Sequence, residues 1–244
     1  MKLRDDAVYL VSYPRSGNTL IRFLIANYQF PSRKINWKTL EWAIPNLRSR
    51  LFTQSHTSIV KDWNPLVFKI HQSNFKGYEG ARVIYIYRDG RDVALSYYHF
   101  SKFHPQVNKE NRCRIFDEFL QKFLLGGIEY GSWKEHVKKW AIDKRRTSPL
   151  LVLKYEEALS EPRDTLRSII DFLGWKYNDA ILKAAVEKSQ YLRMKKVGLR
   201  KAIPMWKIGH TGSAGLWGKT FTAEQRELFL NTAGGVLEKL GYEV

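Results

Sequence analysis

The chain has 244 residues, enough for one substantial hydrophobic core, and its 41 Lys and Arg against 24 Asp and Glu give a formal charge of +17. Its single cysteine, Cys113, excludes an intramolecular disulfide and a metal cluster built from cysteines, and it fits a reducing compartment. Every apolar run is shorter than the roughly 18 residues that indicate a membrane span, so we expect a soluble, cytoplasmic protein.

Three kinds of partner suit so basic a chain: nucleic acid, an anionic membrane surface, or a small polyanion such as a phosphorylated nucleotide. The basic residues are scattered, with short clusters only at Lys144–Arg146 and Lys195–Lys196, and no nucleic-acid-binding motif accompanies them. We therefore expect no nucleic-acid partner, while peripheral contact with an anionic surface stays open.

Residues 8–28, VYLVSYPRSGNTLIRFLIANY, predict a buried strand, a tight loop and an amphipathic helix. The first N–H groups of such a helix point at the loop and bind anions. Gly17 lets the backbone come close to an anion, and Arg15 adds positive charge. The loop has the length of a Walker A motif, but Ser12 replaces its first glycine and Asn18 its lysine. The pattern predicts a phosphate-binding loop that does not belong to an ATPase or GTPase, and an ordinary strand-to-helix turn is the alternative.

The next segments combine an irregular region with a short strand. Residues 31–64 lack clear periodicity, and we interpret them as a substrate-side insertion with short helices. A strand expected at Leu66–His71 places Lys69 and His71 on the same side. A histidine near a phosphate loop can take a proton from an acceptor hydroxyl, although a purely structural role is the alternative.

A third strand, expected at Arg82–Tyr87, is followed by an arginine and, two helical turns later, a serine. Arg88 and Ser96 together suit a second phosphate group, because a guanidinium and a hydroxyl supply several donors. The alternative is an ion pair between Arg88 and Asp89 or Asp92. The sequence leaves both readings open.

The remaining pattern alternates strands and helices. A fourth strand is expected at Leu150–Tyr155, and the last helix starts at Thr222, which opens a capping box. Helical periodicity covers Thr19–Tyr28, Arg91–Phe103, Phe116–Leu125, Ser132–Lys144, Thr165–Leu173 and Asp179–Lys195. Parallel strands joined by helices bind ligands beyond their carboxyl ends. That rule brings four side chains to one edge: Arg15, His71, Arg88 and Tyr155.

Several of these segments, in this order, resemble the family of sulfotransferases that use 3′-phosphoadenosine 5′-phosphosulfate (PAPS). Tyr13–Thr19 is similar to the family's loop for the 5′-phosphosulfate, Val83–Phe100 to its 3′-phosphate segment, and Gly131–Trp140 to a helix of the group. The resemblance spans most of the chain. It implies a single α/β domain over residues 1–244, with three layers, a central parallel sheet flanked by helices and a P-loop-like phosphate-binding loop.

The same resemblance implies the reaction and its residues. A sulfuryl group would pass from PAPS to a hydroxyl or amine acceptor, leaving adenosine 3′,5′-bisphosphate (PAP), without a metal ion. His71 would be the general base, Lys69 would assist at the sulfuryl group, and Arg15, in place of the usual lysine, would stabilise charge on the bridging oxygen. The implied cofactor-binding residues are Arg15, Ser16, Gly17, Asn18 and Thr19 at the 5′-phosphate, Arg88 and Ser96 at the 3′-phosphate, and Tyr155, Ser189 and Tyr191 at the adenine.

Besides Arg15, the chain departs from the family pattern in two places. Leu20 stands where many members have a tryptophan, which weakens or moves adenine stacking. The terminal Arg-Lys-Gly-x-x-Gly-Asp-Trp element appears as HTGSAGLW at residues 210–217, without its basic pair. Within a cofactor-closing loop expected at residues 197–221, Arg200 and Lys201 are the candidates to supply that charge, beside Gly212.

Two other functions fit the residues less fully. A kinase-like phosphotransferase would bind magnesium-ATP, and a noncatalytic protein of this fold would bind nucleotides or polyanions weakly. The acceptor is left open among small alcohols, phenols, glycans and peptides, as is the choice between monomer and homodimer. Trp133 and Trp140 are expected in the core, because their spacing is helical.

Overall fold

The computed structural model describes residues 7–47, 65–72, 80–103, 113–143, 148–190 and 214–244. Four predicted site residues, Tyr191, Arg200, Lys201 and Gly212, lie outside the described residues, as do parts of the expected insertion and closing loop.

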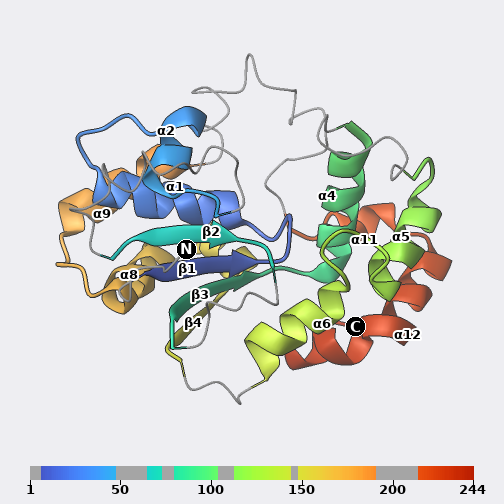
Figure 1. The fold of residues 1–244 in the computed structure, drawn as a ribbon. Coiled ribbons are helices and arrows are strands. Elements are labelled where there is room, and N and C mark those ends of the chain that lie inside the picture. The colour runs from blue at the N-terminus through green and yellow to red at the C-terminus, as the bar shows by residue number, and fades with distance from the viewer. Residues whose placement is uncertain (1–6, 48–64, 73–79, 104–112, 144–147, 191–213) are drawn as a thin grey trace.

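Four parallel strands form the centre of the molecule, in the order β2-β1-β3-β4 (Figure 1). Their bounds are β1 Val8–Ser12, β2 Val67–Ile70, β3 Arg82–Tyr87 and β4 Leu150–Lys154, each within a residue of the expected strand at either end. Because β2 and β3 flank β1 on opposite sides, the order of the strands reverses at β1. The loop after β1 therefore lies at the switch point where open α/β sheets bind ligands.

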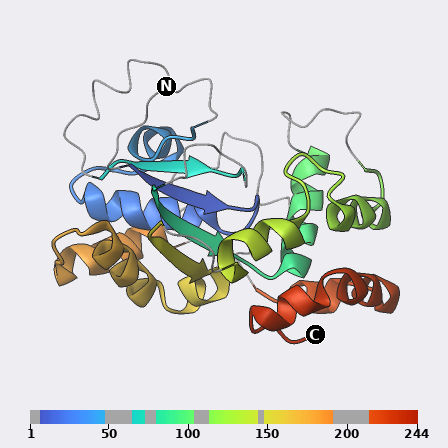
Figure 2. The ribbon, with the colours of Figure 1, turned by 60° about the horizontal axis from the view of Figure 1, so that its bottom comes forward.

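Helices cover both faces of this sheet, as the sequence predicted. Their bounds are α1 Asn18–Gln29, α2 Trp37–Ala43, α4 Gly90–Phe103, α5 Phe116–Leu125, α6 Trp133–Val137, η2 Lys138–Ile142, α7 Tyr155–Ser160, α8 Pro162–Leu173, α9 Asp179–Ser189, α11 Trp217–Thr220 and α12 Ala223–Lys239. Leu10 and Ile84 pack against α1, α8 and α9. On the other face, Tyr9 and Tyr85 pack with Trp140 of η2. Figure 2 shows α1 and α8 together on one side of the strands.

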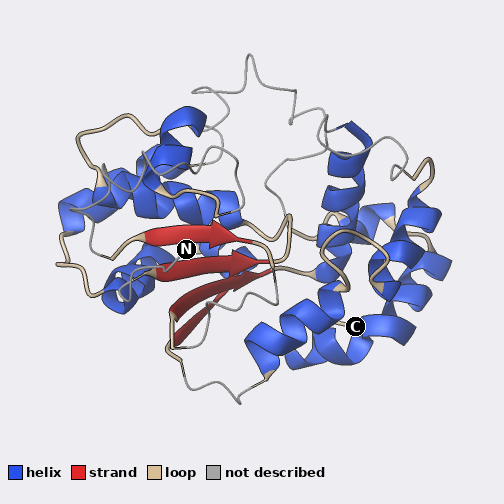
Figure 3. Ribbon diagram, in the orientation of Figure 1, coloured by secondary structure: helices blue, strands red, loops and turns tan. Residues whose placement is uncertain are grey.

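A helical lobe lies beyond the carboxyl ends of the strands, which all point toward it (Figure 3). Its core joins α4, α5, α6 and α12 around Phe123, Trp133 and Phe229. The exposed fractions of Trp133 and Trp140 are 1% and 0%, so both are core residues, as expected. No helix among the described residues is long and apolar enough to cross a bilayer.

Several element boundaries differ from the sequence-based expectation. The helix expected at 132–144 is two pieces, because a π-helical turn, η2, follows α6. Helix α8 begins at Pro162, three residues earlier than expected, since proline is favoured in the first turn. Tyr155 begins α7 instead of ending β4. The Thr222 capping box at the start of α12 is confirmed.

Candidate active site

The loop at residues 13–17 joins β1 to α1, and its backbone turns through left-handed conformations. Gly17, the N-cap of α1, has a φ of 101° and Arg15 has a φ of 71°. Arg15 is the one non-glycine residue with positive φ in the described part of the chain, a conformation that costs about 1–2 kcal/mol and is concentrated at functional turns. The first N–H groups of α1 have no partner inside the helix, so the loop offers donors to an anion.

Three side-chain features shape this loop. Ser16 is completely buried, and its Oγ has no hydrogen-bond partner among the described residues, so it can donate to an anion. A Cβ on Gly17 would lie 2.2 Å from Cδ2 of Tyr155, which shows how closely that ring approaches the loop backbone. Asn18 Nδ2 donates to Ser12 Oγ at 3.1 Å, so this amide ties α1 to β1 and leaves the backbone N–H for a ligand.

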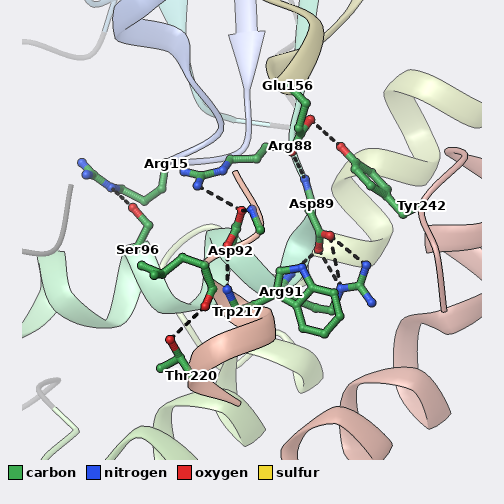
Figure 4. A network of polar contacts seen from close by, with 12 residues as sticks. Arg15, Arg88, Asp89, Arg91, Asp92, Ser96, Glu156, Trp217, Thr220 and Tyr242 are labelled. Carbon is green, nitrogen blue, oxygen red and sulfur yellow. Dashed lines mark hydrogen bonds and ion pairs between the residues drawn. The ribbon is translucent and has the colours of Figure 1, made fainter. Parts of the chain in front are cut away.

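Arg15 reaches from the loop to α4. Its Nε donates a 3.1 Å hydrogen bond to Ser96 Oγ (Figure 4). Its guanidinium carbon lies 4.9 Å from the ring centre of Phe100. The structure thus brings together a residue expected at the 5′-phosphosulfate and one expected at the 3′-phosphate.

Arg88 lies at the end of β3 with an exposed fraction of 7%. Its Nη2 lies 3.2 Å from Oδ2 of Asp92, in the first turn of α4, and its guanidinium carbon lies 4.6 Å from the ring centre of Tyr155. The ion pair that the sequence left open is therefore present, and Asp92 is its partner. The guanidinium carries five N–H donors, so this pair does not exhaust its capacity.

Asp92 also anchors the segment that leads into α11. Its Oδ2 accepts a 2.8 Å hydrogen bond from Gly215 N–H, and its Oδ1 accepts one of 3.1 Å from Trp217 N–H (Figure 4). Next to it, Asp89 Oδ2 pairs with Arg91 Nη2 at 2.8 Å, and the Arg91 guanidinium carbon lies 3.6 Å from the centre of the Trp217 ring. Two buried carboxylates thus connect the end of β3 to the end of the expected closing loop.

Lys69 and His71 stand at the carboxyl end of β2, beside the phosphate loop. His71 Nδ1 lies 2.8 Å from the carbonyl oxygen of Ser12 and 3.2 Å from Ser12 Oγ. Because a carbonyl only accepts, Nδ1 carries the proton, and Nε2 is the basic nitrogen of the neutral ring. This orientation is the one that a general base requires.

Burial sets the charge states of this pair. Burial, followed by the positive charge of Lys69, holds the pKa of His71 well below 6.5. Burial likewise lowers the pKa of Lys69 to about 8, with Arg22 adding to the shift. At neutral pH the imidazole is therefore an unprotonated base beside a lysine that is still mostly charged.

His136 contacts the main chain of His71 and Tyr85 contacts His136, and the sequence assigned a role to neither. His136 Nε2 lies 3.1 Å from the main-chain carbonyl oxygen of His71, and Tyr85 Oη lies 2.9 Å from His136 Nδ1. The available signal was the resemblance of Gly131–Trp140 to a family helix, which contains His136 but does not say what the residue contacts.

Ser189 lies away from this loop. Its hydroxyl donates to the Ala185 carbonyl at 2.7 Å and accepts from Asn27 Nδ2 at 2.9 Å, which fixes α9 on α1. Asn27 is nine residues beyond Asn18, or about 13 Å along the helix. The structure therefore uses Ser189 in packing and does not bring it to the residues gathered at the loop.

Comparison with known proteins gives one consistent family. The sequence model of the family described as the sulfotransferase domain matches residues 5–241 of this chain. Dog sulfotransferase 1B1 is 30% identical over 93% of this chain and 81% of its own length, and mouse sulfotransferase 1A1 is 32% identical over 92% and 82%.

Solved structures share the fold. Mouse SULT7A1 in complex with PAP aligns with a TM-score of 0.73 and 22% identity, over 95% of this chain and 84% of the other. Retinol dehydratase in complex with androsterone and the inactive cofactor PAP also aligns with a TM-score of 0.73, at 21% identity, over 100% and 83%.

Proposed function

This chain belongs to the sulfotransferase family, and we propose that it transfers a sulfuryl group from PAPS to a hydroxyl or amine acceptor. One observation carries the proposal: the ring of His71 is bonded to Ser12, the last residue before the phosphate loop. A base and an anion cradle therefore share one edge of the sheet. The PAP bound in related structures supports the same donor here.

The loop residues fit the 5′-phosphate of such a donor. Ser16 supplies a buried hydroxyl without a protein partner, and Asn18 and Thr19 supply N–H groups at the start of α1. Arg15 lies beside them, and its hydrogen bond to Ser96 holds it at the α4 side of the loop. Bound there, PAPS would supply an activated sulfuryl group.

A 3′-phosphate would be bound by Arg88 and Ser96, which lie on the segment where β3 ends and α4 begins. Asp92 holds one end of the Arg88 guanidinium, so the group is oriented before a ligand arrives. Tyr155 packs against that guanidinium and against Gly17, and this position beside both expected phosphate sites supports a role for its ring as an adenine contact.

Three side chains then have separate roles in the transfer. His71 Nε2 takes the proton of the acceptor as the acceptor oxygen or nitrogen bonds to sulfur and the bond from sulfur to the 5′-phosphate oxygen breaks. Arg15 stabilises the charge left on that phosphate, and Lys69 the charge on the sulfuryl oxygens. Cationic side chains here supply the neutralisation that magnesium supplies in kinases.

The proposal is tested by incubating the purified protein with radiolabelled PAPS and a panel of phenol, alcohol, amine and glycan acceptors. We expect label to move to one acceptor class, and the His71→Ala variant to lose turnover while it still binds PAP. Lys183→Ala, an exposed lysine on α9, is the matched control and should retain full activity. Full turnover by His71→Ala would contradict the assigned base, and absence of transfer with every acceptor would favour a noncatalytic binder.

A further inference from the structure

His136 is almost completely buried, with an exposed fraction of 2%. The rings of Tyr85 and Tyr13 pack on it, the first stacked with 5.6 Å between ring centres and the second edge-on at 5.4 Å. Both imidazole nitrogens are nonetheless bonded, Nδ1 to Tyr85 Oη and Nε2 to the carbonyl oxygen of His71. A buried histidine whose two ring nitrogens are both hydrogen-bonded is strongly fixed in orientation.

These partners determine the tautomer. The carbonyl of His71 only accepts, so Nε2 of His136 carries the proton and Nδ1 accepts from the Tyr85 hydroxyl. Burial lowers the pKa of His136 to about 4 and raises the pKa of Tyr85 well above 10. The neutral arrangement therefore holds across the physiological pH range.

His136 binds the main-chain carbonyl of His71, the first residue after the paired part of β2. The pairing of β1 with β2 ends at Val11 and Ile70, so the strand ladder does not hold His71. Its main chain is held by His136 and its ring by the Ser12 carbonyl, at 3.1 Å and 2.8 Å. Together these two bonds determine where the free nitrogen of His71 points.

The helix that carries His136 is built to hold Tyr85 as well. After Val137 the helix widens into the π-helical η2, and Trp140 stacks on Tyr85 with 5.8 Å between ring centres and an interplanar angle of 17°. Single π-helical turns inside helices are frequent at functional sites. The hydroxyl that fixes the His136 tautomer is therefore itself fixed by packing.

We propose that His136 is a positioning residue for sulfuryl transfer: through its hydrogen bond to the His71 carbonyl it sets the position of the catalytic imidazole, and Tyr85 sets the tautomer of His136. The inference rests on the proposed role of His71 as the general base.

Three variants test it. His136→Ala removes the donor and should lower kcat by about 10²-fold, the cost of a misplacement near 1 Å, with the Kd for PAP unchanged. His136→Gln keeps an N–H donor on a side chain of similar reach and should recover most of that loss. Trp133→Phe, buried in the same helix but packed against Phe229, is the control, and it should lower Tm without lowering kcat.

A second readout needs no acceptor. In protein labelled with ¹⁵N-histidine, we expect the His136 resonance to report a neutral ring protonated at Nε2 from pH 5.5 to 8. A proton on Nδ1, or protonation of the ring near pH 6, would overturn the assigned tautomer.

The outcomes separate the two proposals. If His71→Ala keeps its activity, the base assignment fails whatever His136 does. If His71→Ala is inactive and His136→Ala keeps its kcat, only the positioning role fails. Equal losses in His136→Ala and His136→Gln that follow a matching loss of Tm would reduce His136 to a structural residue.

Discussion

The ring of Tyr155 lies against the backbone of Gly17, so that a Cβ added there would stand 2.2 Å from Cδ2 of the ring. Two elements far apart in sequence, the phosphate loop and the start of α7, are thus packed without room for even a methyl group. The geometry leads to the first prediction.

Gly17→Ala should abolish nucleotide binding, because the added methyl group must displace either the loop or Tyr155, and because φ is 101°. Gly174→Ala is the matched control, since Gly174 also has positive φ, 70°, but a Cβ there meets nothing within 4 Å. The control should lose only about 1–2 kcal/mol of stability and bind PAP normally. Calorimetry with PAP distinguishes them, and normal binding by Gly17→Ala would contradict the close packing.

Asp92→Asn removes the negative charge that pairs with Arg88 inside the protein. We expect the free energy of unfolding to fall by about 3–5 kcal/mol, the usual cost of leaving a buried charge without its partner. Urea denaturation measures this change. Asp164→Asn, at an exposed position in the first turn of α8, should change it by less than about 1 kcal/mol. If the free energy of unfolding of Asp92→Asn fell as little as that of Asp164→Asn, the Asp92 network would not stabilise the fold.

The pH dependence of kcat/KM should be a broad plateau with limbs set by two side chains. Since the pKa of His71 is lowered well below 6.5, activity should persist at pH 6.0, where an ordinary histidine would be about three quarters protonated. Activity should fall above about pH 8 as Lys69 loses its proton. Lys69→Arg keeps the charge at high pH, so its alkaline limb should move upward. If the alkaline limb of Lys69→Arg did not move, a group other than Lys69 would be responsible for that limb.

Acid should destabilise the fold before the carboxylates titrate. His136 has a pKa of about 4 in the folded protein and about 6.5 when unfolded. Its contribution is therefore complete above pH 6.5 and is lost as the pH falls toward 4, by at most about 1.4 kcal/mol per pH unit. Between pH 6.5 and 5, Tm should fall less steeply in His136→Gln than in the wild type. Parallel slopes would show that His136 does not titrate in this way.

The strands and most helix positions could be predicted, because local periodicity in the sequence encodes them. The position of the loop could be predicted because Gly17 stands between a strand pattern and a helix pattern. The long-range polar contacts could not. Asp92 binds the backbone of Gly215, 123 residues away, and His136 binds the carbonyl of His71, 65 residues away. No local pattern specifies such pairs.

Resemblance to a family also has limits as a predictor of contacts. It suggested Ser189 as an adenine contact, which stays a prediction, and it did not indicate that the hydroxyl of Ser189 bonds to Asn27 and Ala185 between two helices. It named Arg88 as a phosphate ligand but left its ion pair with Asp92 as an open alternative. The reason is that a motif gives the type of a residue and its place along the chain, and not the side chains that pack around it.

The most direct test of the account is calorimetric titration of the protein with PAP, adenosine 5′-monophosphate and magnesium-ATP at physiological salt. Two charged hydrogen bonds from Arg88 are worth about 3–6 kcal/mol, so PAP should bind at least about 10²-fold more tightly than the monophosphate. In Arg88→Ala this preference should disappear, and in Lys183→Ala it should remain. Equal affinity for PAP and the monophosphate, or a preference for magnesium-ATP, would contradict a PAPS-dependent sulfotransferase.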